Sequence, residues 1–183
     1  MTTIQAQRTV PAGSWTADRT HSSATFEVGH LGVSTFNGKI KDFAASVNVG
    51  DETFVLDGSA RVESLDIDEE NLKAHLLSPE FFDVERHPAI RFRADRLDAN
   101  DDGLVIAGDL EIKGHTKQVE ATGHVGELVV DPTGAERVAL ELETVIDRTE
   151  FGLNWNMDLP NGGKALADEV RLTVSLELVR DEA

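Results

Sequence analysis

Histidine is the side chain of this sequence best suited to chemistry, because an imidazole can bind a metal ion or transfer a proton near neutral pH. The chain has six of them, at positions 21, 30, 75, 87, 115 and 124. The sequence contains no His-x-His or HExxH motif and no tight grouping of histidine with glutamate. We therefore expect no metal site. His30 and His75 are interpreted either as buried rings bonded to backbone carbonyls or as polar contacts to a bound ligand.

Two other groups of residues resemble catalytic sets. Ser22 stands next to His21, but neighbouring residues of a strand point to opposite faces, so they cannot act together in a triad. Asp147, Arg148 and Glu150 combine both signs of charge. A buried structural ion pair, or the closing of a barrel end, is a simpler interpretation of these three. The chain has no cysteine, which excludes thiolate catalysis, disulfides and Cys-ligated zinc. We expect no enzyme activity.

Length and charge limit the class of protein. A chain of 183 residues fits one domain, expected over residues 13–183 after a flexible tail at 1–12. Its 34 acidic residues against 17 basic ones give a formal charge of −17, which repels phosphate backbones and anionic lipid headgroups. We expect no nucleic-acid partner and no stable membrane insertion. The chain lacks a signal-like apolar stretch of about 7 to 15 residues at its start and any apolar run of about 18. This predicts a cytoplasmic protein, unless a leader was removed.

Alternation of apolar and polar residues dominates the sequence and predicts antiparallel strands with one face in water. The apolar face of these strands comprises Ala24, Phe26, Val28 and His30; Phe43, Ala45, Val47 and Val49; Ile90, Phe92 and Ala94; Leu104, Ile106, Gly108, Leu110 and Ile112; Val138, Leu140, Leu142, Thr144 and Ile146; and Val170, Leu172, Val174, Leu176 and Leu178.

Short turn signals separate the predicted strands, at residues 50–51, 100–103, 113–116 and 131–134. Consecutive strands are therefore expected to be neighbours. Eight or nine long strands of this kind form either a sandwich or a barrel. Glycines within the strand patterns favour the barrel, because they permit sharp bends; they are Gly38, Gly58, Gly108 and Gly123.

The pattern changes between residues 65 and 82. Asp66 and Glu69 have the spacing of a capping box, and the side chains at 72, 75 and 76 share one helical face. Ser78 is expected to cap a second turn that begins at Pro79, which two adjacent phenylalanines follow. We predict a short helical segment that covers or lines one end of the barrel.

Five segments, taken in order, resemble the YceI family of lipocalin-like, polyisoprenoid-binding proteins: residues 18–32, 75–83, 87–92, 108–117 and 147–153. The resemblance implies an antiparallel, up-and-down barrel of about eight strands with an apolar interior. It also implies binding of an isoprenoid or similar amphipathic lipid, and a possible homodimer. Many members carry a secretory leader, which this chain does not show.

The predicted ligand is therefore a long-chain isoprenoid or fatty-acid derivative, with no other cofactor. The predicted apolar lining is Phe26, Val28, Phe43, Val47, Leu72, Leu76, Phe81, Phe82, Ile90, Phe92, Leu110, Ile112, Leu140, Leu142, Leu172 and Val174. The predicted headgroup contacts are His30, His75 and Arg148. Two alternatives stay open: an isomerase or cyclase acting in the same cavity, and an interaction module with a solid core.

Overall fold

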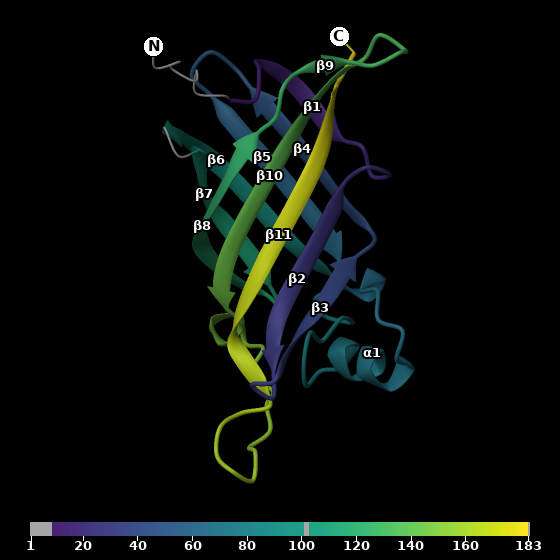
Figure 1. Ribbon diagram of the computed structural model, residues 1–183, viewed down its shortest axis with the longest axis vertical. Coiled ribbons are helices and arrows are strands. Elements are labelled where there is room, and N and C mark those ends of the chain that lie inside the picture. The colour runs from purple at the N-terminus through teal and green to yellow at the C-terminus, as the bar shows by residue number, and fades with distance from the viewer. Residues whose placement is uncertain (1–8, 101–102, 183) are drawn as a thin grey trace.

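The computed structural model describes residues 9–100 and 103–182, and the statements below refer to these residues. They form eleven strands, one α-helix and two 3-10 helices (Figure 1), in the order β1 (Gly13–Ala17), β2 (Ser23–His30), β3 (Ser34–Ile40), β4 (Phe43–Val49), β5 (Phe54–Arg61), η1 (Val62–Ser64), α1 (Glu70–Leu77), β6 (Ala89–Asn100), β7 (Gly103–Ile112), β8 (His115–Val125), β9 (Val129–Val130), β10 (Glu136–Asp147), η2 (Arg148–Phe151) and β11 (Leu166–Arg180). None of the described helices is long and apolar enough to cross a bilayer.

Eight antiparallel strands close a barrel. Within the described chain their order is β1, β4, β5, β6, β7, β8, β10 and β11, and β11 pairs back with β1. The longest pairing joins β10 to β11 and runs from Arg137 opposite Val179 to Asp147 opposite Glu169. The predicted all-β barrel with one short helix is confirmed.

The β2–β3 hairpin extends the barrel wall at one end. β11 pairs with β1 at Trp15 opposite Arg180, and further down the same edge with β2 at Ser23 opposite Ser175. β3 pairs along β2, and the Asp66 N–H donates to the Lys39 carbonyl at 2.8 Å. Figure 1 shows this hairpin and α1 at the end of the barrel opposite the chain termini. The wall is therefore longest where the helix lies.

The interior divides into two apolar clusters. One contains Trp15, Val47, Leu140 and Leu178, each fully shielded from solvent, and fills the barrel near β1. The other gathers around Phe151 and includes side chains of η1, α1 and the start of β11. The alternation along the strands builds both clusters, because every second side chain points inward.

The start of α1 differs from the predicted capping box. Glu69 is the N-cap, and its carboxylate accepts hydrogen bonds from the N–H groups of Asn71 at 3.1 Å and Leu72 at 2.6 Å. Asp66 cannot cap the helix, because its backbone is held in an extended bridge to β3. The tertiary contact therefore shifts the helix start by one turn.

The end of α1 also differs from the prediction. Ser78 is the C-cap of α1 and does not begin a new helix. Its hydroxyl donates to the His75 carbonyl at 2.7 Å, and its own carbonyl accepts from the N–H groups of Phe81 and Asp83. These bonds fold the chain back in successive turns, which bring both phenylalanines against the helix.

Two of the predicted interior glycines allow close approach of other groups. A side chain on Gly123 would collide with the Glu141 carbonyl of β10, and one on Gly38 would collide with the Phe26 ring. Both positions therefore require glycine for packing, beyond the bending that the sequence suggested.

The predicted turns at 50–51, 113–116 and 131–134 connect β4 to β5, β7 to β8 and β9 to β10. At the turn predicted for 100–103, residues 101 and 102 lie outside the described residues, as do residues 1–8 of the predicted tail. Val10 is buried in the apolar cluster around Trp15, and the Trp15 indole N–H donates to the Pro11 carbonyl at 2.9 Å. The packed part of the chain therefore begins before residue 13.

Candidate functional site

A cavity of about 500 Å³ occupies the α1 end of the barrel. Its lining comes from β2 to β8, η1, α1 and the turns after it, β10, η2, β11 and the connection between η2 and β11. Phe43, Leu56 and Leu142 belong both to the lining and to the cluster around Trp15, so they form its floor. The volume lies in the range of small-molecule sites. Nearly all of the lining is apolar, which suits an apolar ligand.

The predicted lining agrees with this cavity at all but two positions. Fourteen residues lie in its wall: Phe26, Val28, Phe43, Leu72, Leu76, Phe81, Phe82, Ile90, Phe92, Leu110, Ile112, Leu142, Leu172 and Val174. Val47 and Leu140 do not, which corrects the prediction for them. Both point inward but pack in the filled end, where Trp15 and its neighbours leave no space. Alternation gives the direction of a side chain and not its height along the barrel.

The connection from η2 to β11 supplies lining residues that the sequence analysis missed. Leu153, Trp155 and Met157 all face the cavity. A signal for them exists, because apolar residues alternate with Gly152, Asn154 and Asn156 from position 151 to 157. The segment forms no strand, yet its alternating apolar side chains point into the cavity as those of the strands do.

Aromatic rings form the cover at the α1 end. The His75 ring meets Trp155 edge to face at a centroid distance of 4.6 Å and Phe81 at 6.0 Å. Phe81 and Phe82 stack obliquely at 5.3 Å. Leu76 is buried beneath them, whereas Leu72 on the same face of α1 is partly exposed. The predicted inward face of α1 is therefore correct, and it both lines and covers the cavity.

His75 carries a polar atom that the protein leaves without a partner. Its Nε2 is shielded from solvent and makes no hydrogen bond within the described chain. Its Nδ1 lies 3.6 Å from a carboxylate oxygen of Glu80, whose side chain is exposed. A buried polar atom without a partner costs free energy, so such an atom calls for an explanation. One of the two interpretations predicted that the His75 ring bonds a backbone carbonyl. Neither ring nitrogen does so in the described chain.

Arg148 lines the cavity, yet its donors are used by the protein. The guanidinium is buried and donates to the carbonyls of Ala167 at 2.8 Å and Trp155 at 3.0 Å, and also to that of Leu153. It pairs with Asp168 at 3.4 Å. Burial lowers the pKa of the Arg148 guanidinium, while the neighbouring carboxylates of Asp168 and Asp147 act in the opposite direction. Its geometry matches the structural interpretation of this charged group.

Asp147 and Glu150, the other two members of the charged set, are exposed and lie outside the cavity lining. Asp147 accepts hydrogen bonds from the backbone and hydroxyl of Thr149 and so caps η2. These bonds lower the pKa of the Asp147 carboxyl. His30, the third predicted headgroup contact, is exposed at the mouth of the cavity.

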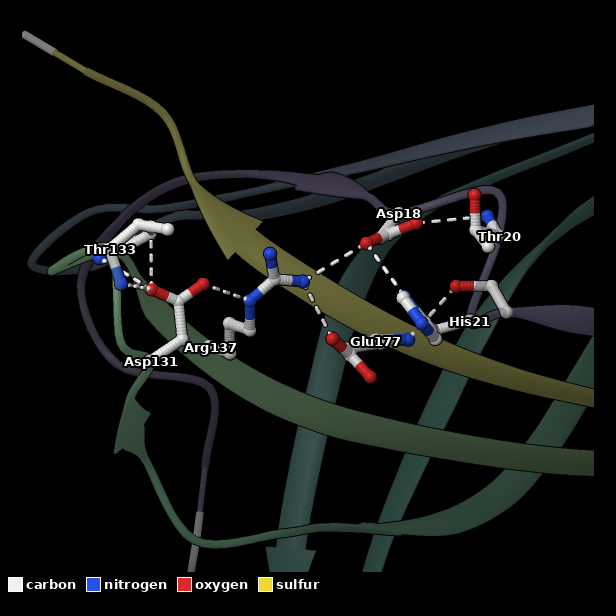
Figure 2. Close-up of polar contacts among 9 residues, drawn as sticks. Asp18, Thr20, His21, Asp131, Thr133, Arg137 and Glu177 are labelled. Carbon is white, nitrogen blue, oxygen red and sulfur yellow. Dashed lines mark hydrogen bonds and ion pairs between the residues drawn. The ribbon is translucent and has the colours of Figure 1, made fainter.

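A second polar cluster lies away from the cavity. Figure 2 shows Arg137 of β10 between the carboxylates of Asp18 and Glu177, at 3.0 and 2.6 Å, with Asp131 on its other side at 2.7 Å. Asp18 also contacts the ring of His21 at 3.0 Å. The cluster ties the β1–β2 turn to β10 and β11. Because Arg137 already compensates the carboxylates, we assign the cluster a structural role.

The contacts of this cluster shift its pKa values. Hydrogen bonds from His21, Arg137 and the backbone of Thr20 hold the pKa of the Asp18 carboxyl well below its usual value. The hydrogen bond between Asp18 and His21 raises the pKa of the His21 ring. Bonds from Thr133 and Arg137 lower the pKa of the Asp131 carboxyl. Both carboxylates therefore stay charged across the neutral range.

The match to a family model decides the relationship of this chain to known proteins. The model described as the YceI-like domain matches residues 15–178. The chain belongs to the YceI family. The match spans both the barrel and α1.

Relatives of this YceI-like chain occur in several bacteria. It is 28% identical to a UPF0312 protein of Photorhabdus laumondii over 165 residues, covering 88% of this chain and 83% of the relative. A UPF0312 protein of Pseudomonas aeruginosa is 29% identical over 163 residues, covering 87% and 82%.

Solved structures show the same fold. Burkholderia cenocepacia BcnA superposes with a TM-score of 0.75 at 18% identity, covering 90% of this chain and 99% of BcnA. A polyisoprenoid-binding domain from Saccharophagus degradans, implicated in plant cell wall breakdown, has a TM-score of 0.68 at 10% identity and coverages of 91% and 98%. At these identities, the likeness concerns the fold.

Proposed function

We propose that this protein binds and carries an amphipathic lipid with a long apolar chain, a polyisoprenoid or a similar isoprenoid or fatty-acid derivative. The observation that carries the proposal is the apolar cavity of about 500 Å³ inside the barrel. Burial of one methylene gains about 0.8 kcal/mol, so a five-carbon isoprene unit gains roughly 4 kcal/mol without any directional contact. The polyisoprenoid-binding name of one structural neighbour supports the same ligand class.

We propose binding without catalysis. The ionisable side chains of the described lining are His30, His75, Glu143 and Arg148. Arg148 is occupied by backbone carbonyls and Asp168, and His30 is exposed at the mouth. His75 is the lining residue best suited to meet a polar end of the ligand, because its Nε2 lacks a partner. The alternative of a solid-cored module does not fit a barrel that contains this cavity.

The first test is direct. Lipids extracted from the purified protein are identified by mass spectrometry, and binding of C20 to C40 isoprenoids and of fatty acids is titrated. The proposal predicts a co-purified lipid, or saturable binding of at least one of these classes. It fails if the protein yields no lipid and binds none of them.

A filling substitution links binding to the cavity. Leu142→Trp enlarges a side chain of the cavity floor, whereas Val145→Trp adds the same ring to the outer face of β10, where Val145 is 48% exposed. If the larger ring keeps only two methylenes of the lipid out of the cavity, the binding free energy falls by about 1.6 kcal/mol. Leu142→Trp should therefore weaken lipid binding more than tenfold. Val145→Trp should bind normally. Equal affinities in two folded variants, checked by circular dichroism, would place the ligand elsewhere.

A further inference from the structure

Large apolar side chains surround the mouth of the cavity. We call Leu31, Val33, Leu72 and Met157 the mouth rim; Val33 is 86% exposed and Met157 55% exposed. Leu31, Leu72 and Met157 also line the cavity, so the apolar surface continues from the interior to the outside. Exposed apolar patches on soluble proteins mark ligand, protein or membrane contacts.

Backbone hydrogen bonds connect the two loops of the rim, the β2–β3 turn and the loop before β11. The Leu31 N–H donates to the Ala165 carbonyl at 2.7 Å, and the Ala165 N–H donates to the Met157 carbonyl at 2.9 Å. Figure 1 shows the β2–β3 turn, the loop before β11 and α1 at one end of the barrel, with both termini at the other. The structure therefore presents the rim at a single, fixed end.

The two loops of the rim contain few charges. Residues 31–38 include no ionisable side chain, and within residues 151–163 the ionisable one is Asp158. Asp158 is neutralised by Lys164 at 2.6 Å. The whole chain is 28% charged and has a net charge of −17. These two loops are therefore neutral and apolar on an acidic protein. Leu72 lies on α1, which begins with the exposed carboxylates of Glu69 and Glu70, and these add to the repulsion of anionic surfaces.

We propose that the mouth rim docks on a lipid bilayer of net-neutral headgroups, so that a lipid passes between bilayer and cavity without crossing water. This inference rests on the proposed function. Each methylene lowers the equilibrium constant for moving a lipid from the bilayer into water about fourfold. For the five carbons of one isoprene unit, this amounts to about a thousandfold. A rim in contact with the bilayer removes that cost from the transfer step.

The test measures transfer of geranylgeraniol from phosphatidylcholine vesicles to the protein, and separately its equilibrium binding when supplied from cyclodextrin. Val33 lies outside the cavity lining, so Val33→Asp changes the rim alone. We expect transfer from vesicles to slow by about tenfold or more, with affinity from cyclodextrin unchanged. For the wild type, the rate should rise with vesicle concentration and fall when anionic phosphatidylglycerol is added.

Val130→Asp is the matched control. Val130 is 59% exposed in β9, at the end that carries the termini, so its variant should transfer at the wild-type rate. A wild-type transfer rate in folded Val33→Asp, or a rate independent of vesicle concentration, overturns the docking proposal while leaving the proposed function intact. If the wild type takes up no geranylgeraniol from cyclodextrin, the proposed function fails, and docking for lipid exchange fails with it.

Discussion

His21 and Asp18 show how single residues act together at the filled end of the barrel. Asp18 bonds the His21 ring, its own turn at Thr20 and Arg137. Ser22 beside them is buried, and its hydroxyl accepts from the Glu177 N–H at 3.0 Å. The first five residues of the motif segment 18–32 thus have a structural explanation: these side chains fix the turn at which the chain passes from β1 to β2.

Asp18→Asn should move the pKa of His21 down toward its ordinary value, because the largest cause of its upward shift is removed. The raised pKa of His21 contributes stability below about pH 6.5, and this is lost as pH rises through the folded pKa. The lowered pKa of the Asp18 carboxyl contributes stability above about pH 4, and this stability is lost as pH falls through the pKa of the folded state. Both contributions are present between about pH 4 and 6.5.

An NMR titration of the His21 ring measures the effect, with His124 as an exposed reference that pairs with Glu141 across β8 and β10. An unchanged His21 pKa in Asp18→Asn would show that the hydrogen bond does not control it. A shift of both histidines would indicate a general change in structure.

At the scale of elements, the connection from η2 to β11 depends on one buried side chain. Three backbone carbonyls of that connection and of β11 accept hydrogen bonds from Arg148. Trp155 then lies against His75 of α1, so Arg148 indirectly holds the aromatic cover of the cavity. The guanidinium suits this task because its donors point in several fixed directions.

Arg148→Lys should lower the free energy of unfolding by about 2 to 4 kcal/mol. A single ammonium cannot reach all three carbonyls, and each buried acceptor left without a donor costs about 1 to 3 kcal/mol. Urea unfolding followed by circular dichroism measures this. The matched control is Arg171→Lys, an exposed arginine that pairs with Glu27 and Glu143, which should change stability by less than about 0.5 kcal/mol. Equal effects of both substitutions would refute the structural role of Arg148.

The whole molecule has two unlike ends. Side chains around Trp15 fill the barrel near the termini, while the end with α1 is hollow and opens at the mouth rim. The 34 acidic residues outnumber the 17 basic ones two to one, so the protein carries a large excess of negative charge. Such an excess of one sign opposes the compact state through self-repulsion.

Salt should therefore stabilise this protein. Between about 20 mM and 0.5 M sodium chloride, screening shortens the Debye length from roughly 20 Å to about 4 Å and weakens the repulsion. A gain of about 1 kcal/mol corresponds to a rise in Tm of about 2 to 4 °C for a chain of this length. Differential scanning calorimetry at neutral pH measures it. A Tm that falls with salt would mean that the surface ion pairs outweigh the net repulsion.

Much of the fold could be predicted from the sequence because its physical basis is local. Alternation fixes which side chains of a strand point inward, and this is why ten of the predicted lining residues that lie in strands face the cavity. The helical spacing of Leu72, His75 and Leu76 likewise gave the correct inward face of α1. These periodicities follow from backbone geometry and need no knowledge of the neighbouring strand.

The tertiary structure alone decided the rest. It placed Val47 and Leu140 in the filled end, because height along a barrel depends on strand register and on what packs opposite. It moved the cap of α1 from Asp66 to Glu69 through a bridge to β3, and it used the donors of Arg148 on carbonyls of the connection to β11 and of Ala167 in β11. The exposed rim around the mouth arises in the same way. Leu31, Leu72 and Met157 are far apart in the chain, and only closure of the barrel brings their apolar surfaces together.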